Sequence, residues 1–581
     1  MIKRLVESLN NENLTIYKDD VPNFELPIYY IDKKNIIEQN IIDDLELQTC
    51  ENNISIYENL FYTNKDYRSQ NSIINKWSEY YTNDVNFLKD MQNLVNQYET
   101  DNSCIEELNK VDDILKDVKS DTGFLERYNY IDTENFTELN DLPLVLQILT
   151  LHNLAGPVLS LIIPIIMCIV PFFLIKLKGL ELSFENYLKF LLETFKHHAL
   201  GKSLNNFNEG TLNQKMFVIL SFVFYGWNMY QNVLTCKQFH KNIYKVKDYL
   251  LTISNFLKQS INKINNINSY CGQSMYNFVN TNNKIKNIIN YFNNSIEKIN
   301  LNNINITTIG KIGEIFHCFY KLYKIDTLQK SIRYCIHLNC FSDHIGCIKE
   351  NLENKNLNLC KFSKKNNTSF KDAYYIALIN KENVKNSYIL DKKLLITGPN
   401  AAGKTTLLKT TIINILLSQN LGLGCYKNCH LNPYKFIYSY INIPDTSDRD
   451  SLFQAEARRC KEILDNFENF KKERHFCIFD EIYSGTNPVE AIASAYSFIK
   501  YISKNKNIDL LLTTHYIKLC KLFINDENIL NNQMIVSENK PKYKLGENIS
   551  NVKGGIRVLE ELKYNSDIIS LAREILEKIN E

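Results

Sequence analysis

The sequence predicts a mostly α-helical N-terminal two-thirds followed by a C-terminal α/β domain of the P-loop NTPase class. Upstream of about residue 365, glycines are few and apolar residues recur at spacings of three and four, as in Val246–Ile264 and Asn283–Ile299. Downstream, short apolar runs at Tyr375–Ile379 and Leu394–Thr397 are typical of strands, and the second leads into a glycine-rich turn. This change of pattern marks the start of the α/β domain.

Length and composition fit a folded protein of several domains. The 581 residues are 44% hydrophobic and 23% charged, and the net charge of +2 argues against a strongly basic nucleic-acid coat protein. We expect four segments: a helical N-terminal region (1–140), apolar helices (141–236), a long-helix lever or core region (237–365) and the α/β domain (366–581).

The opening residues carry no secretory-signal pattern, and fifteen cysteines are scattered without a regular framework. We therefore expect an intracellular protein with reduced thiols, in the cytoplasm, the nucleus or a viral factory. Association with a membrane is an open alternative.

Two charge-free stretches carry that alternative. Leu142–Ile175 is long enough for a bilayer-spanning helix, and Met216–Cys236 is a second, weaker stretch with aromatic residues that suit an interface. The pair forms either a membrane hairpin or two buried core helices. Prolines within the first stretch favour a membrane, where neighbouring helices can satisfy the freed backbone groups.

The charges that flank the first stretch point the other way. A hairpin with a cytosolic α/β domain would place Lys176 and Lys178 outside and the acidic Glu138 and Asp141 inside. That arrangement opposes the tendency for basic residues to stay on the cytosolic side. Both interpretations therefore remain open.

A phosphate-binding loop follows the strand Lys393–Thr397 and precedes a helix at Thr405–Leu417. It matches G-x-x-x-x-G-K-[ST] at every defined position. Its residues are Gly398, Pro399, Asn400, Ala401, Ala402, Gly403, Lys404 and Thr405, with Thr406 directly after. In such a loop, backbone N–H groups and the helix N-terminus face phosphate oxygens, the lysine reaches the β- and γ-phosphates, and the threonine hydroxyl ligates Mg²⁺. The pattern predicts ATP and Mg²⁺ as ligands.

Two further strand ends complete the predicted site. The apolar run Phe476–Phe479 ends in Asp480, which can hold Mg²⁺, and Glu481, which can polarise the attacking water. The run Leu510–Thr514 ends in His515, which can sense the γ-phosphate. We predict Glu481 and His515 as catalytic residues and Thr405 with Asp480 as the metal ligands.

These motifs together resemble the MutS family. The loop Thr397–Thr406 is close to the family's T-G-P-N-x-x-G-K-S/T, Asp480–Asn487 resembles its D-E-x-x-x-G-T-S, and Thr513–His515 matches its T-T-H. Ser451–Glu456 is similar to the signature S-T-F-x-x-E, and Val384–Asn386 lies where the family has V-P-N. The resemblance covers about 370–581 and implies an ABC-like ATPase domain of the domain V type.

The same resemblance implies a dimer, either a homodimer or a MutS-like heterodimer, in which Ser451 completes the ATP site of the partner subunit. DNA is the implied partner, in mismatch repair or recombination. Lys385 and Leu452 depart from the usual proline and threonine. No trustworthy Phe-x-Glu mismatch wedge is visible, so virus-encoded and divergent bacterial MutS-like proteins are the nearer comparison.

Two functions follow. The first is a MutS-like ATPase that couples hydrolysis in a dimeric composite site to DNA binding. The second is a membrane-associated MutS-like ATPase without direct mismatch recognition, anchored through 142–175 and 216–236.

Overall fold

The computed structural model describes residues 15–17, 20–49, 54–61, 68–99, 105–177, 212–301, 310–363, 367–441, 452–537, 540–550 and 562–580, with a few more residues between 179 and 191 and at 559–560. The chain divides into two compact units. Unit 1 is Met1–Pro22, Glu106–Ile261 and Ile285–Cys335, and unit 2 is Asn23–Ile105, Asn262–Lys284 and Ile336–Glu581. The units are not contiguous in sequence, whereas the four predicted segments follow the chain, and those segment boundaries stay a prediction.

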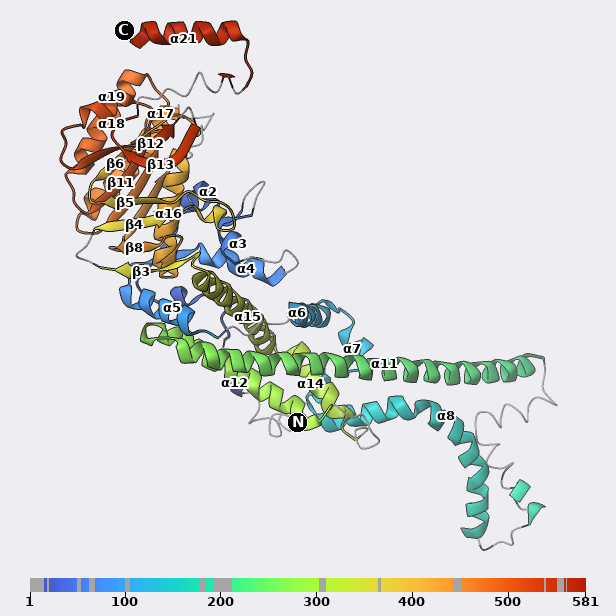
Figure 1. Ribbon diagram of the computed structural model, residues 1–581. Coiled ribbons are helices and arrows are strands. Elements are labelled where there is room, and N and C mark those ends of the chain that lie inside the picture. The colour runs from blue at the N-terminus through green and yellow to red at the C-terminus, as the bar shows by residue number, and fades with distance from the viewer. Residues whose placement is uncertain are drawn as a thin grey trace. The chain divides into compact units, whose positions relative to one another are not determined.

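Helices make up the described part of unit 1 (Figure 1). They are η1 (Thr15–Tyr17), α6 (Ile105–Ser120), α7 (Phe124–Arg127), η3 (Thr137–Asp141), α8 (Pro143–Leu177), α11 (Leu212–Tyr270), α12 (Tyr276–Ile299), α14 (Ile312–Lys324) and α15 (Asp326–Glu353), of which α11, α12 and α15 also contribute to unit 2. The apolar spacing in α11 places Val246, Leu250, Ile253 and Leu257 on one buried face. The predicted helices at Val246–Ile264 and Asn283–Ile299 are confirmed.

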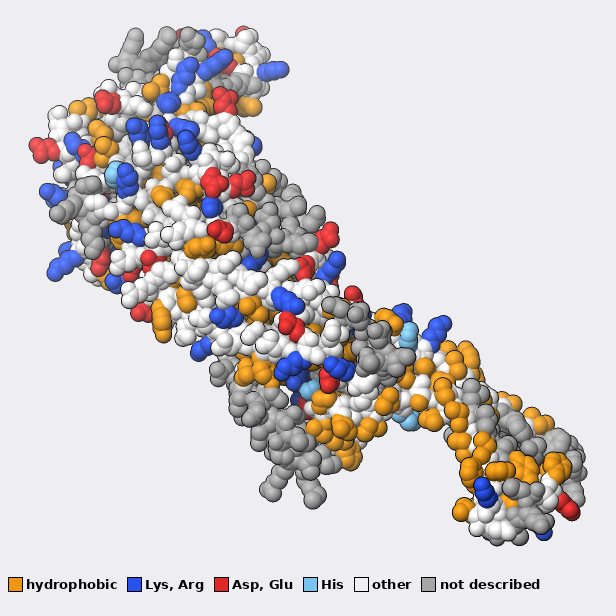
Figure 2. All heavy atoms as spheres, turned by 60° about the horizontal axis from the view of Figure 1, so that its bottom comes forward, with side chains coloured by type: hydrophobic (Ala, Val, Ile, Leu, Met, Phe, Trp, Pro, Cys, Tyr) orange, Lys and Arg blue, Asp and Glu red, His pale blue; other side chains and the backbone are white. Residues whose placement is uncertain are grey.

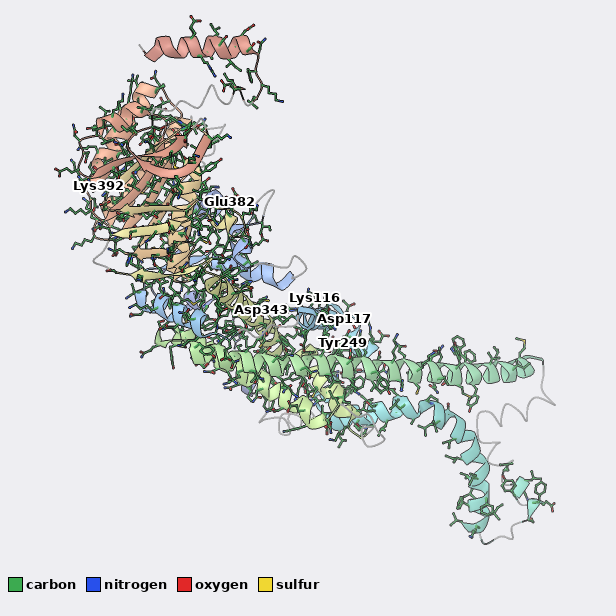
Figure 3. All side chains as sticks on the ribbon, viewed as in Figure 1. Lys116, Asp117, Tyr249, Asp343, Glu382 and Lys392 are labelled. Atoms are coloured by element: carbon green, nitrogen blue, oxygen red, sulfur yellow. The ribbon has the colours of Figure 1, made fainter. Side chains whose placement is uncertain are left out.

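Polar contacts fix α6 against α11 within unit 1. The Asp117 carboxylate accepts a hydrogen bond from the Tyr249 hydroxyl at 2.7 Å, and both residues are labelled in Figure 3. It also accepts a hydrogen bond from Lys245 Nζ at 3.0 Å. These two donors hold the pKa of Asp117 below its usual value.

The first halves of α8 and α11 form a hairpin whose apolar side chains face outward. Most of the described apolar side chains of the two charge-free stretches are exposed, and Figure 2 shows hydrophobic side chains gathered there. By length and composition, the segment Pro143–Ser160 is the one candidate membrane span among the described residues, and 11% of it is buried. Most side chains of this segment therefore lie outside the core of unit 1, although Leu146 and Thr150 near its start are buried.

Unit 2 contains the α/β part of the chain. Residues 23–105 contribute η2 (Pro27–Tyr30), β1 (Lys34–Ile36), α2 (Gln39–Asp44), α3 (Ile56–Phe61), α4 (Arg68–Trp77), β2 (Tyr80–Thr82) and α5 (Val85–Gln97), and η4 (Gln273–Met275) lies between α11 and α12. The remaining elements are β3 (Asn358–Phe362), β4 (Thr368–Ala373), η5 (Ile376–Leu378), β5 (Asn386–Leu390), β6 (Lys393–Thr397), α16 (Lys404–Asn420), β7 (Leu423–Gly424), β8 (Asn428–Leu431), β9 (Phe436–Tyr440), α17 (Leu452–Asn469), β10 (His475–Asp480), α18 (Pro488–Ser503), β11 (Ile508–Thr514), α19 (Ile517–Leu522), β12 (Ile529–Ser537), β13 (Lys540–Glu547) and α21 (Ser566–Asn580). The prediction of a helical N-terminal part followed by an α/β C-terminal part is confirmed.

The main sheet of unit 2 has six strands in the order β13-β12-β6-β11-β10-β9. All neighbours pair in parallel except β12 and β13. Buried side chains of α17, α18 and α19 pack with the sheet in one apolar core. A second sheet has the order β5-β4-β8-β3-β7, and β1 pairs with β2. Because β6, β10 and β11 run in parallel, their carboxyl ends meet at one edge.

One predicted strand is wrong. Tyr375–Ile379 forms the 3₁₀ turn η5, in which Leu378 N donates to Tyr375 O and Ile379 N donates to Ile376 O, both at 2.9 Å. Its buried residues Ile376 and Ile379 are three positions apart, which matches the three-residue period of this turn. A short apolar run cannot by itself distinguish a strand from a helical turn.

Residues 23–105 pack onto the α/β part inside unit 2. The Asn420 amide at the end of α16 donates to Trp77 O at 2.9 Å and to Tyr80 O at 2.8 Å, and Gln419 Nε2 donates to Thr82 O at 3.0 Å. Gln92 Nε2 donates to Gly422 O at 2.6 Å. The α/β part is therefore built on a segment that ends more than 250 residues upstream of β3 (358 − 105 = 253).

Candidate functional site

The phosphate-loop motif connects β6 to α16. All five residues of β6 are buried, and Gly403 caps α16 with a left-handed backbone (φ 91°) that glycine adopts without strain. Gly398, Pro399 and Ala402 are buried, whereas Asn400, Ala401 and Thr406 are exposed. The loop thus lies directly before a helix N-terminus, whose N–H groups and dipole favour an anion.

The Lys404 side chain lies folded within this loop. Its Nζ atom donates to Gly398 O at 3.0 Å and to Pro399 O at 3.3 Å, and it lies 3.1 Å from His515 Nε2. Burial lowers the pKa of Lys404, and the nearby carboxylates of Glu481 and Asp480 oppose this shift.

Thr405 and Asp480 meet where β6 and β10 end. The Thr405 hydroxyl donates to Asp480 Oδ2 at 2.7 Å, and the Thr513 hydroxyl donates to Asp480 Oδ1. Thr513 is the register partner of Asp480 in the parallel pair of β10 and β11. A hydroxyl and a carboxylate side by side provide oxygen ligands that suit Mg²⁺. This ion is usually bound by a few protein oxygens together with water and phosphate oxygens.

Glu481 and His515 form a pair beside Lys404. Their side chains lie 2.7 Å apart, and each is roughly 40% exposed, at 42% for Glu481 and 39% for His515. The hydrogen bond from His515 is the main cause that lowers the pKa of Glu481. Glu481 has a left-handed backbone (φ 58°), and its N–H donates to Thr513 O at 3.1 Å. The side chains predicted as catalytic are therefore brought together at the phosphate loop.

Ser451, which the sequence analysis assigned to the ATP site of a partner subunit, lies outside the described residues. The helix that follows it, α17, begins at Leu452.

Glu456 of α17 has a local role that the sequence analysis did not assign. Its carboxylate is buried and accepts hydrogen bonds from Ser484 N at 3.0 Å, Ser484 Oγ at 2.9 Å and Gly485 N at 3.1 Å. A Cβ atom on Gly485 would lie 2.8 Å from Leu452 Cγ and from Phe453 N. Glu456 thus anchors the turn that follows Glu481, and the signature-like spacing Ser451–Glu456 was the signal for it.

Tyr543 of β13 is a second residue that the motifs did not reveal. A Cβ atom on Gly403 would come within 3.0 Å of its ring, so the ring lies against the phosphate loop, and 47% of Tyr543 is exposed. The amide of Asn386 donates to Tyr543 O at 3.0 Å, and its oxygen accepts from Leu545 N at 2.8 Å. Because this contact joins distant strands, no local sequence pattern could have indicated it.

Comparisons with known proteins find similar sequences for the C-terminal part of the chain. The family model described as MutS domain V matches residues 394–580. The Endonuclease MutS2 of Fusobacterium nucleatum subsp. nucleatum is 28% identical over 191 residues, which cover 32% of this chain and 24% of that protein. A DNA mismatch repair protein MutS of Clostridium botulinum is 30% identical over 211 residues, covering 34% of this chain and 22% of that protein.

The chain aligns with less than a quarter of the length of each of these relatives. The region matched by the family model contains all of β6 except Lys393, together with the phosphate loop, Asp480, Glu481 and His515. Over residues 394–580 the chain therefore carries a domain V of the MutS family.

Proposed function

We propose that this chain is a P-loop ATPase of the MutS type, which binds and hydrolyses ATP with Mg²⁺ at Gly398–Thr406. The observation that carries the proposal is that two bonded groups meet at the phosphate loop: His515 lies within hydrogen-bonding distance of both Lys404 and Glu481, and Thr405 bonds to Asp480. The match to MutS domain V supports it.

Each residue of the site would have its own role in ATP hydrolysis. When bound, ATP and Mg²⁺ supply a polarised γ-phosphoryl group that can be transferred to water. Lys404 would exchange its contacts to Gly398 O and Pro399 O for phosphate oxygens, and Thr405 and Asp480 would hold the metal. Glu481, kept anionic by its bond to His515, would orient the attacking water and accept its proton. His515 lies between Lys404 and Glu481, so it would register the loss of the γ-phosphate.

A second subunit belongs to this proposal. Ser451 would close the ATP site of the partner, in a homodimer or a MutS-like heterodimer. The C-terminal helix α21 exposes Ile568, Leu571 and Ile575, which lie three and four residues apart on one face. An exposed apolar helix face of this kind suits a subunit contact.

We also propose that ATP hydrolysis is coupled to the binding of DNA, in mismatch repair or recombination. The similarity to the DNA mismatch repair protein MutS of Clostridium botulinum supports this proposal. Retention of the purified chain on DNA at low salt, with and without ATP, tests it, because phosphate contacts are strongest there. Loss of all retention under both conditions would reject the DNA partner and leave the ATPase proposal intact.

Steady-state ATP hydrolysis tests the site itself. We expect Lys404→Ala and Glu481→Gln to lower kcat by about 100-fold or more, since each removes positioning or charge stabilisation from the phosphoryl transfer. Lys504→Ala and Glu473→Gln are matched controls, because both residues are exposed in the same unit away from the loop. Near-wild-type turnover in either site variant would refute the assignment.

A second candidate keeps the same ATPase but places it at a membrane, without direct mismatch recognition. The outward-facing apolar side chains of α8 and α11 favour this candidate. Alkaline carbonate extraction of cell membranes tests it, and complete release into the soluble fraction would exclude it.

A further inference from the structure

We infer that the hairpin of α8 and α11 inserts into a lipid bilayer, with Lys237, Lys241 and Tyr244 at the level of anionic headgroups. This inference rests on the membrane-bound candidate proposed above and adds the depth of insertion and the class of lipid. It does not depend on ATP hydrolysis, because both helical segments lie in unit 1 and the phosphate loop lies in unit 2.

One face of α11 changes from apolar to basic along its length. Val223, Trp227, Tyr230 and Leu234 are exposed and follow spacings of four, three and four, which places them on one side of the helix. The same stripe continues with Lys237, Lys241 and Tyr244 at spacings of three, four and three, and these side chains are exposed as well. Lysine and tyrosine at the end of an apolar stripe match the interface of a bilayer, where the stems are buried and the polar ends reach the headgroups.

The length of the apolar part of α11 fits a bilayer. No charged residue occurs among the 21 residues from Met216 to Cys236, and at 1.5 Å per residue this stretch is about 31 Å long. The hydrocarbon layer of a membrane is about 30 Å thick. Lys215 and Lys237 lie directly outside the two ends of the stretch.

The contact between α8 and α11 supplies a hydrogen-bond donor to a backbone carbonyl, which the lipid of a bilayer could not do. Pro164 has no N–H, so the carbonyl of Ser160, four residues earlier in α8, loses its usual helical donor. The Tyr225 hydroxyl of α11 donates to this carbonyl at 2.8 Å, and Cys236 Sγ lies 3.7 Å from Leu154 O further along the pair. In water the carbonyl would need no protein donor, whereas in lipid an unsatisfied carbonyl is costly.

The orientation follows from the connection of α11 to the remainder of unit 1. Lys237 and Lys241 lie on the side from which α11 continues into that unit. Two lysines at a surface attract an anionic leaflet. Lys215 lies at the opposite end together with Lys176 and Lys178, so the number of lysines alone does not set the orientation.

The two tryptophans of the chain provide the test. Trp227 is 60% exposed on the apolar stripe, whereas Trp77 is buried in unit 2. The full-length protein is mixed with vesicles of phosphatidylcholine and phosphatidylglycerol, with or without bromine on the acyl chains, and its fluorescence is recorded. We expect brominated chains to quench part of the wild-type emission, and we expect Trp227→Phe to abolish that quenching because Trp77 stays in its protein core.

Two outcomes would overturn bilayer insertion. The first is emission that brominated lipid leaves unchanged, with the protein absent from floated vesicles. The second is a stable dimer in which Trp227 is shielded from aqueous iodide without lipid, since a second copy would then cover the stripe. Normal ATP turnover in the same samples would leave the ATPase proposal standing in both cases.

The headgroup assignment has its own measurement. We expect Lys237→Gln/Lys241→Gln to weaken partition into phosphatidylglycerol-containing vesicles by about fivefold for each lysine. Partition into pure phosphatidylcholine should stay the same. Lys504→Gln/Lys506→Gln removes two exposed lysines of unit 2 and is the matched control. Equal partition of the hairpin variant and the control into anionic vesicles would refute the headgroup assignment.

Discussion

At the scale of single residues, the buried carboxylate of Glu456 connects the signature-like helix α17 to the turn after Glu481. It accepts three hydrogen bonds from Ser484 and Gly485, and Gly485 has no room for a side chain against Leu452 and Phe453. Tyr483, directly before this turn, has a left-handed backbone (φ 56°), as does Glu481. The position of Glu481 therefore depends on a residue that does not itself contact the phosphate loop.

We expect Glu456→Gln to lower kcat by about tenfold, since hydrogen bonds to a charged group contribute about 1.5–3 kcal/mol and the amide keeps one acceptor oxygen. The KM for ATP should change little, because Lys404 and Thr405 are untouched. Steady-state kinetics would measure both parameters, with Glu462→Gln on the exposed face of α17 as the control. A rise in KM at unchanged kcat would contradict the positioning role.

At the scale of elements, the packing of α14 on α8 depends on a glycine. A Cβ atom on Gly313 would lie 2.4 Å from Pro143 O and 2.6 Å from Gln147 N, which are backbone atoms that cannot move aside. The Gly313 N–H also donates to Gln147 Oε1 at 2.7 Å. The close approach of the two helices therefore fixes the start of α8, where the hairpin begins.

We expect Gly313→Ala to destabilise the protein by about 1–3 kcal/mol through overpacking. Gly226→Ala in α11 is the matched control, because a Cβ atom added there would meet no atom within 4 Å and alanine favours a helix by about 1 kcal/mol. Denaturant unfolding of the two variants would measure the difference. Equal stability of both variants would show that the contact between α14 and α8 is loose in solution.

At the scale of the whole molecule, the α/β part depends on residues from the beginning of the chain. Besides the contacts of Gln419 and Asn420, the Ser439 hydroxyl of β9 donates to the buried Asp44 carboxylate at 2.6 Å. Trp77, Phe87 and Leu88 of residues 23–105 are fully buried in this unit. Removal of these residues would uncover apolar surface and leave several buried polar groups unpaired.

We therefore expect residues 336–581 alone to be much less soluble and to melt at a lower temperature than the full chain. Unpaired buried polar groups cost about 1–3 kcal/mol each, in addition to the lost apolar contacts. Thermal unfolding and soluble yield would measure this, with co-expressed residues 23–105 as the rescue. A fragment 336–581 that melts like the full chain would contradict the dependence.

The α/β character of the C-terminal part and the residue types of the candidate site follow from the sequence alone. The phosphate loop, Asp480, Glu481 and His515 each follow a short buried strand, and parallel strands bring their carboxyl ends to one edge. The residues of a strand-end site can therefore be predicted from local pattern and spacing.

Features that depend on distant contacts needed the folded chain. The anchoring of the turn by Glu456, the ring of Tyr543 against the loop and the packing of residues 23–105 all join segments with no shared local pattern. The sequence also could not decide whether the apolar side chains of α8 and α11 are buried in a protein core or exposed. An apolar stretch has the same pattern in a core and in a membrane. That choice depends on which side chains find partners, and only the tertiary fold determines this.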